Sequence, residues 1–399
     1  MPALSGGGQA GVDLAARLES ARSRVHGLES ALAERAVVLL DRLSRSVIHP
    51  YAMSSSQTNL AASDFTDFDD DDLRNSNDGP MLVSRLRMWA RSEVAATAVE
   101  APLPQYSWML TDGEGRHEFM RTPVFSSVLF AIDTTTWCLD RPYVLDRGAA
   151  LLARAREDAG SSVNDVHLSV LGEVVLGGMT GAEVEEALML GVYPAAGRQS
   201  SVWDRSLLAH ALFGDRPPRL KGQASDLLAD LRDRVAGLRM RLMDAVPSAW
   251  SLESGTLNLA ASATTAMSRE DMRNDEGGPF LVSEMRMWTA SALAAASAGA
   301  VFSNVDVSVE SVAERIRLMS DPVMAGVLVS RETGTWRFDH PHIVSPTGSL
   351  QVHLRETAAN ATTDVNVSFL GEVLRGVSQE DVRSAVALGL LPTSMRGFE

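Results

Sequence analysis

The stretch Gly79–Trp89, GPMLVSRLRMW, decides how the rest of the chain is interpreted, because it returns at Gly278–Trp288 as GPFLVSEMRMW. Eight of the eleven positions are identical, and the two copies lie 199 residues apart. The same shift relates most of the flanking sequence. An internal period of this length indicates a repeated structural unit. The chain is therefore predicted to be a tandem duplication of one domain.

The shift also predicts the domain limits. Residues 1–12 are an N-terminal arm, 13–195 the first repeat domain, 196–221 a linker and 222–399 the second repeat domain. The linker contains the run Arg216-Pro217-Pro218-Arg219, which is typical of a stiff joint. Before that run, Trp203 to Leu212 is predicted to form a short amphipathic helix.

Composition bounds the class of protein. The chain has 399 residues, 45% of them hydrophobic and 22% charged, which is typical of a folded protein with two or three domains. A net charge of −15 argues against a surface that grips phosphate throughout. The single cysteine, Cys138, excludes an internal disulfide framework and a cysteine-based zinc site.

The sequence also bears on location. The N-terminus lacks the charged and then apolar pattern of a signal peptide, and no apolar run approaches the roughly 18 residues that span a bilayer. We therefore expect a soluble, cytoplasmic protein with no membrane partner, or a virion component if the protein is viral.

Two long helices are predicted, one at the start of each repeat. Apolar residues between Val12 and Ser46 recur at three- and four-residue steps, the spacing of an amphipathic helix. Gly27 predicts a break or bend in this helix. Positions 224 to 246 repeat the pattern.

The repeated Gly-Pro motif itself is predicted to continue as a helix. Leu82, Leu86 and Trp89 would share one face at helical spacing. A stripe of Met and Trp is more often core than a ligand box. Arg87 and Arg286 would lie on a different face, as rim ion pairs or, less commonly, as contacts to phosphate or carboxylate.

A small β-hairpin is predicted inside each domain, for example Val327–Ser330 paired with Thr335–Phe338. Trp137 and Trp336 would cover the core beneath it. Each copy would then close with a helical hairpin, whose second helix begins at the capping boxes Thr180/Glu183 and Ser378/Asp381. The predicted fold class is therefore mainly α, with a minor β component in each copy.

An acidic run at 64–72 occurs in the first copy alone. It lacks the spacing and central glycine of an EF-hand loop, so a solvated acidic loop or a contact with a basic partner is favoured over a bound cation. By contrast, Asp72, Arg74 and Asn75 recur as Asp271, Arg273 and Asn274, and these are predicted to form turns and caps.

The duplication provides a test for chemistry, because a site of the shared domain should appear twice. His49, His167 and His340 face Ser248, Asn366 and Arg141, so no histidine recurs. Neither a P-loop, a dinucleotide fingerprint, a zinc-protease motif nor a nucleophile elbow is present. We predict no catalytic residue, no cofactor and no metal.

The residues that do recur are mainly apolar, glycine, proline and tryptophan, together with a few charges, and they are predicted to support the shared fold. The structural pairs are Gly79 and Gly278, Pro80 and Pro279, Arg87 and Arg286, Trp89 and Trp288, Trp137 and Trp336, Asp140 and Asp339, and Glu173 and Glu372.

These observations favour a self-assembling structural protein, most of all a capsid or nucleocapsid coat subunit built as a fused pseudo-dimer. Its partner would be itself, in a homo-oligomer or lattice that encloses viral nucleic acid without binding it tightly. In plan this resembles the duplicated, largely helical coat proteins of some double-stranded RNA fungal viruses, without a shared motif.

Two alternatives remain open. One is an intracellular binding or regulatory protein that holds a ligand or partner where the repeats meet. The other is an enzyme at that junction, built on carboxylates such as Glu173 and Asp140.

Overall fold

The fold was analysed in a computed structural model. The structure describes residues 7–56, 58–60, 64–90, 106–113, 118–120, 122–130, 135–158, 163–194, 220, 222–259, 264–267, 270–289, 305–319, 322–329, 333–357 and 365–391. The linker helix predicted around Trp203 lies outside these residues.

The protein is mostly β, so the predicted mainly α fold class is wrong. Strands make up 46% of the structure and helices 25%, and the described residues form four antiparallel sheets and six helices. The correction also removes the resemblance in plan to largely helical coat proteins.

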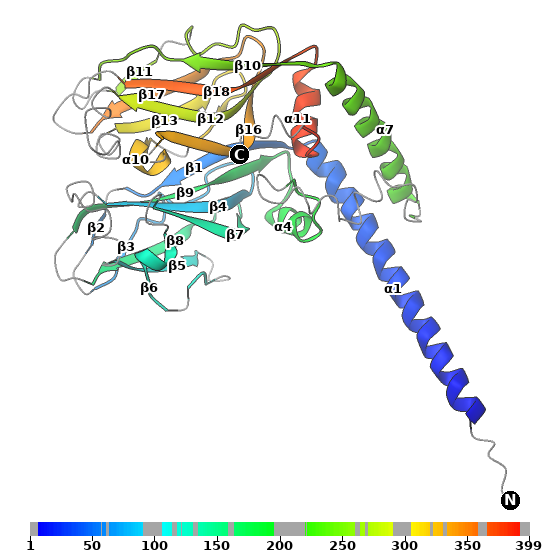
Figure 1. The fold of residues 1–399 in the computed structure, drawn as a ribbon. Coiled ribbons are helices and arrows are strands. Elements are labelled where there is room, and N and C mark those ends of the chain that lie inside the picture. Colours follow the sequence, from blue (N-terminus) through cyan, green and yellow to red (C-terminus); the bar gives the residue numbers. More distant parts are fainter. Residues whose placement is uncertain are drawn as a thin grey trace, which may run out of the picture.

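The first half is a long helix followed by a two-sheet sandwich with a short helix at its end (Figure 1). One sheet has the order β1-β9-β4-β7, with β2 beside β9, and the other the order β3-β8-β5-β6. Its elements are α1 (Gly7–Ser44), β1 (Val47–Ser54), β2 (Thr58–Leu60), β3 (Thr66–Asp67), β4 (Met81–Ala90), β5 (Tyr106–Asp112), β6 (Val124–Phe125), α3 (Ser126–Leu129), β7 (Thr136–Leu145), β8 (Leu151–Glu157), β9 (Val163–Leu176) and α4 (Gly181–Met189).

The second half has the same plan. Its sheets have the orders β10-β18-β12-β16 and β11-β17-β13-β14, with β15 beside β13. Its elements are α7 (Gln223–Asp244), β10 (Val246–Glu253), β11 (Thr264–Ala266), β12 (Phe280–Thr289), β13 (Val305–Ser311), β14 (Ile316–Arg317), β15 (Val323–Met324), α10 (Ala325–Leu328), β16 (Thr335–Val344), β17 (Leu350–Glu356), β18 (Val365–Arg375) and α11 (Gln379–Ala387).

Corresponding strands of the two halves pair in the same register. The ladder of β4 with β9 shifts between Val83 and Arg85, and the ladder of β12 with β18 shifts between Val282 and Glu284. Such a shift is a β-bulge, which inserts one extra residue and bends the strand. The inserted residue is a serine in both halves, and its hydroxyl donates to the carbonyl of Leu171 or Leu370.

The repeated Gly-Pro motif is therefore the central strand β4 or β12, and the predicted helix there is wrong. Leu86 and Met88 point into the sandwich core, whereas Arg87 and Trp89 point to the opposite face, which is also buried in the first half. A strand with two buried faces carries apolar residues on both, and short segments of this kind fit a helical spacing equally well. The segment up to Leu176, predicted as the first arm of a helical hairpin, is strand β9 for the same reason.

The β-hairpin predicted in the second half is correct for one of its two arms only. The second arm, Thr335–Phe338, does lie in strand β16, but Ala325–Leu328 forms the short helix α10.

Four glycines hold the paired strands close together. A Cβ at Gly79 or Gly278 would lie 2.0 or 2.3 Å from the carbonyl oxygen of Val175 or Leu374. Gly172 and Gly371 approach Leu82 and Leu281 just as closely. No side chain fits at these distances, so the repeated glycines follow from contact between backbones. The amide side chains of Asn75 and Asn274 fix the turn before each motif by donating to the Gly79 and Gly278 carbonyls, which confirms their predicted role as turn formers.

The two prolines of the repeated motif stand directly before strands β4 and β12, so the prediction that they lead into a helix is wrong. The Val175 amide donates to the carbonyl of Pro80 at 3.0 Å, and the Leu374 amide donates to the carbonyl of Pro279 at 3.0 Å. Proline has no N–H to donate, so a central strand accepts it only where the ladder needs its carbonyl alone. Pro80 and Pro279 therefore occupy the position directly before the same strand in each half.

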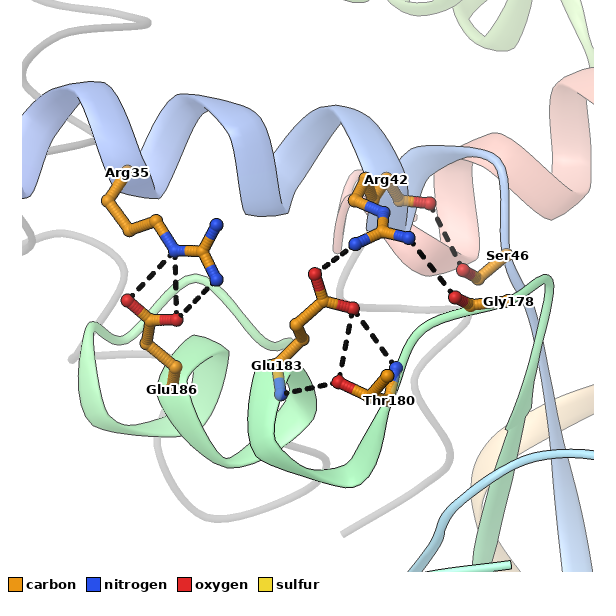
Figure 2. Close-up of polar contacts among 7 residues, drawn as sticks. All are labelled: Arg35, Arg42, Ser46, Gly178, Thr180, Glu183 and Glu186. Atoms are coloured by element: carbon orange, nitrogen blue, oxygen red, sulfur yellow. Dashed lines mark hydrogen bonds and ion pairs between the residues drawn. The ribbon is translucent and has the colours of Figure 1, made fainter.

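Helix α1 is continuous through Gly27 and is anchored on the short helix α4 (Figure 2). The Arg35 guanidinium donates to the Glu186 carboxylate at 2.8 and 2.9 Å. One turn earlier in α4, Glu183 accepts from Arg42 and also closes the predicted capping box with Thr180. The second half repeats this anchor, because Arg241 of α7 donates to Asp381 of α11 at 2.8 Å.

Candidate functional site

The most extensive contact between the halves lies between two named surfaces. The outer side of β1, β9 and β4 in the first half is its receiving face. The side of the second half formed by residues 315–319, β15, α10 and β16 is its inserting face. In Figure 1 the second half is stacked above the first, with β16 and α10 against β1, β9 and β4.

Apolar side chains make the centre of this interface. Ala52, Trp89 and Leu171 of the receiving face join the hydrophobic core cluster of the second half. Trp89 is 2% exposed. The edge of strand β1 is also occupied, because the Ala52 amide donates to the Leu318 carbonyl at 3.1 Å. The inserting face thus covers both the surface and the free edge of the sheet.

Charged and polar side chains surround the apolar centre. Ser84 and Arg85 donate to the two oxygens of Asp339, at 2.7 and 2.6 Å. Arg87 is buried and donates to the Leu328 carbonyl at 2.6 Å and to the Thr136 hydroxyl at 3.0 Å. Burial lowers the pKa of Arg87 to about 10, with a smaller effect of the neighbouring Arg85 charge, so its guanidinium is still protonated at neutral pH.

Glu173 forms the deepest polar contact of the interface. Its carboxylate accepts from the Tyr193 hydroxyl at 3.1 Å and from Nδ1 of His340 in the second half. Burial acts to lower the pKa of His340, but the adjacent Glu173 charge and hydrogen bond outweigh it, so the pKa is raised. Burial, together with the Glu173 charge, raises the pKa of Tyr193. Glu173 therefore links the two halves through the ring of His340.

Two further histidines are buried at the same junction. Burial lowers the pKa of His49 to about 4, and burial together with the His49 charge lowers that of His342 to about 3. Nε2 of each ring has no hydrogen-bond partner among the residues that the structure describes. Both rings are therefore neutral at pH 7.

A pocket of ≈ 230 Å³ opens beside this cluster. The first half contributes His49, Tyr51 and Asp78 to its lining, and the second half contributes Arg315 and Arg317. Arg315 has a φ of 56°, a left-handed conformation that is uncommon for a residue other than glycine. The pocket is mainly polar in its lining and lies at the seam of the halves.

The receiving face has an exposed counterpart in the second half. Trp288 occupies the position of Trp89 but is 41% exposed. Trp250 and Val246, which correspond to Tyr51 and Val47, are also among the exposed large hydrophobic residues. Arg286 is exposed as well and pairs with Glu284 of its own strand at 2.6 Å.

The inserting face has an exposed counterpart in the first half. Val128 of α3 is 73% exposed, whereas its equivalent Val327 in α10 is fully buried. Phe125 is exposed, and its equivalent Met324 is buried. In β7, the residues Cys138, Asp140 and Arg141 are exposed. Within a single chain, one receiving face and one inserting face therefore cover each other, and the second face of each kind stays exposed.

The predicted structural pairs do not behave alike in the two halves. The glycine and proline pairs hold the same contacts twice, and Trp336 is buried in its core while Trp137 is half-buried against the other. Arg87, Trp89, Glu173 and Asp339 meet at the interface, whereas Arg286, Trp288, Glu372 and Asp140 do not.

Sequence reasoning missed Ser84, Arg85, Tyr193 and His340, which complete the interface. His340 was set aside because it does not recur. The test for chemistry looked for residues that are identical in the two copies. An interface that forms once between two similar halves is instead marked by residues that differ between the copies.

The acidic run at 64–72 contains strand β3 and, after it, a surface turn in which Asp70 and Asp71 pair with Arg74. Within the described part of the chain, no helix is long and apolar enough to cross a membrane.

Comparisons with known proteins provide little. No family model matches the chain, and no curated protein matches it. Among solved structures it is similar to the PBSX exported protein XepA, with a TM-score of 0.17 and 10% identity over 83% of this chain and 88% of that one. It is also similar to recombinant pro-11S globulin of pumpkin, with a TM-score of 0.15 and 10% identity over 87% and 98% of the two chains. TM-scores this low carry no argument about fold or function.

Proposed function

We propose that this chain is a self-assembling structural protein, and that its finer role is that of a coat subunit. The observation that carries the proposal is the pair of exposed faces described above. Five of the exposed large hydrophobic residues, Phe125, Val128, Val246, Trp250 and Trp288, lie at positions whose counterparts form or adjoin the internal interface. Contiguous apolar surface rimmed by polar groups is typical of a protein–protein contact.

The edge of the second half supports the same proposal. Strand β10 is the outer strand of its sheet, and Ser251 corresponds to Ala52, whose amide bonds the Leu318 carbonyl in the first half. No such bond is made by the Ser251 amide among the described residues. An open strand edge beside exposed tryptophans is a template for another chain.

The test is light scattering with negative-stain microscopy on the purified full chain over a wide range of concentration. Assemblies larger than the 42.8 kDa monomer are expected. Trp288→Ser should suppress them, because burial of a large side chain contributes about 2–3 kcal/mol to an interface. Met243→Ser is the matched control, since Met243 is 83% exposed on α7, outside both faces. A monomer at every concentration would refute the proposal.

The coat role is read separately, from the ratio of absorbance at 260 and 280 nm in assembled material from cells. A raised ratio would support enclosed nucleic acid. Assemblies without nucleic acid would leave a structural protein of another kind.

The alternative of a ligand at the junction is favoured by one observation, the pocket that Arg315 and Arg317 share with Asp78. Two guanidinium groups beside a cavity suit an anionic ligand. If scattering shows a monomer, this pocket is the place to search, with inorganic phosphate as the first probe.

A further inference from the structure

The internal interface states which surface should bind which. It joins a receiving face to an inserting face, so it is heterologous: the two surfaces in contact are different. The exposed receiving face belongs to the second half, and the exposed inserting face belongs to the first half. In Figure 1 they lie at opposite ends of the stack, with β10 at the top and β6, directly before α3, at the bottom. One chain therefore cannot bring its own two open faces together without unstacking.

We propose that copies of this chain bind head to tail, the first half of one copy docking on the second half of the next as the two halves dock within the chain. This inference rests on the proposed self-assembly and names its partner, a second copy. Repetition of one heterologous contact gives a ring if the rotation closes and a filament if it does not.

The apolar parts of the two open faces match in kind. Within the chain, Val327 of α10 is buried beside β4, the strand that carries Trp89, and Met324 of β15 is buried beside β1. Between copies, Phe125 and Val128 would take their places against Trp288. In both cases a tryptophan ring meets aliphatic or aromatic side chains. Interface centres typically have this composition.

One polar contact of the interface has a complementary counterpart between the open faces, with a substitution in one of its two partners. Within the chain, the contact is Glu173 with His340. The corresponding residues of the open faces are Glu372 and Arg141, so the carboxylate is kept and the imidazole ring is replaced by a guanidinium.

Glu372 lacks the partners that Glu173 has. Its Oε2 atom is buried with no hydrogen-bond partner among the described residues. Leu391 stands where the first half has Tyr193, so the hydroxyl that serves Glu173 is also missing. A buried carboxylate oxygen without a donor is costly. An arriving Arg141, which is exposed, would supply the donor.

Two of the remaining polar contacts have equivalents, whereas the ion pair of Arg85 with Asp339 does not, because its counterparts Glu284 and Asp140 are both carboxylates. Ser283 stands in the position of Ser84 and would donate to Asp140, the counterpart of Asp339. Arg286, the counterpart of Arg87, would donate to the carbonyl of Leu129, which corresponds to Leu328.

The decisive experiment exchanges charges between the two faces and follows assembly by sedimentation velocity. Arg141→Glu and Glu372→Arg should each raise the concentration needed for assembly by about tenfold or more, because like charges then oppose each other. A mixture of the two variants should assemble again, since each then meets a complementary face on the other. Glu380→Arg, an exposed change on α11, is the matched control and should leave assembly unchanged.

Folding is checked by unchanged circular dichroism and urea midpoints. The outcomes separate the two proposals. A monomeric wild-type chain refutes self-assembly itself. A wild-type chain that assembles while neither charge variant alters it refutes head-to-tail docking alone. Assembly that is lost in each variant but not restored by mixing also contradicts the pairing of Glu372 with Arg141.

The single cysteine offers a second readout in the same sample. Within the chain, Arg85 reaches the carbonyl of Arg337, at 3.2 Å. The counterparts are Glu284 and Cys138, so Glu284→Cys should be joined to Cys138 of the next copy by a short bismaleimide, giving a ladder of multimers. The variant that also carries Cys138→Ser should give no ladder. A ladder that persists in it would contradict the proposed contact.

Discussion

At the scale of single residues, the two copies show how one position acquires two roles. Trp89 and Trp288 are identical in sequence and occupy the same place in their strands, yet one is buried and the other is exposed. Burial of an aromatic side chain is a property of the surface that covers it. The sequence predicts that both are apolar positions of the same kind, but it does not show that the second half of the chain packs over Trp89.

The two arginines of the repeated motif are expected to differ in their contribution to stability. Arg87→Met should lower the free energy of unfolding by about 1–3 kcal/mol, because the Leu328 carbonyl loses a buried donor. Arg286→Met should change it by less than about 0.5 kcal/mol, because Arg286 is exposed. Urea unfolding followed by circular dichroism measures both. Equal effects of the two substitutions would contradict the interface described here.

At the scale of elements, the four longer helices were predictable, whereas the short helix α10 and most strands were not. The boundaries of α4 and α11 follow from the capping residues Thr180 and Ser378 and from the stops at Gly191 and Gly389, which adopt φ values of 68° and 63°. Strands β4 and β9 escaped because the first half buries both of their faces, so the alternation that identifies a strand is lost.

The capping residues provide a prediction for these helices. Glu183→Ala removes the reciprocal bond to the Thr180 amide at 3.1 Å and the ion pair with Arg42 of α1, and should lower stability by about 1 kcal/mol. Asp381→Ala should cost a similar amount in the second half. Glu185→Ala, an exposed change in the same helix as Glu183, is the control. Thermal unfolding of the three variants decides, and a loss in the control equal to that of Glu183→Ala would rule out the capping explanation.

At the scale of the whole molecule, the repeated pattern was visible in the sequence, whereas the contact between the two halves was not. Repeated glycines and prolines identify a shared fold, and Gly79 and Gly172 prove to be places where two backbones touch. The interface residues Arg85 and His340 have different counterparts, Glu284 and Arg141, because the two halves meet through unlike surfaces. A comparison of identical positions therefore finds the fold and overlooks the junction.

The buried histidines of this junction make the stability of the whole molecule depend on pH. The folded pKa values of His49 and His342, about 4 and about 3, lie below the unfolded value of 6.5. Above pH 6.5 both rings are neutral in the folded and in the unfolded chain, so their protonation does not change the free energy of unfolding. Between pH 6.5 and the folded values the unfolded chain binds more protons, so each ring lowers stability by about 1.4 kcal/mol per pH unit.

His340 acts in the opposite direction, because its pKa is raised: its contribution is present below pH 6.5 and is lost as the pH rises through its folded value. Two rings against one leave a net loss on acidification. We expect the urea concentration at the unfolding midpoint to decrease as the pH is lowered from 7 to 5. Ordinary carboxylates change their protonation little in this range. His49→Phe should weaken this dependence. A midpoint that stays constant over the range would contradict the proposed state of the two rings.

Helix α1 has a consequence for any row of subunits. Its 38 residues span about 57 Å, and its N-terminal part projects away from both sandwiches (Figure 1). In a head-to-tail row every copy is related to the next by the same rotation and translation, so the projecting helices would be equally spaced along the row. Leu28 and Leu32 are exposed on each of them. A partner that binds one such helix weakly would bind a row of them with an avidity that grows with the number of helices it can reach.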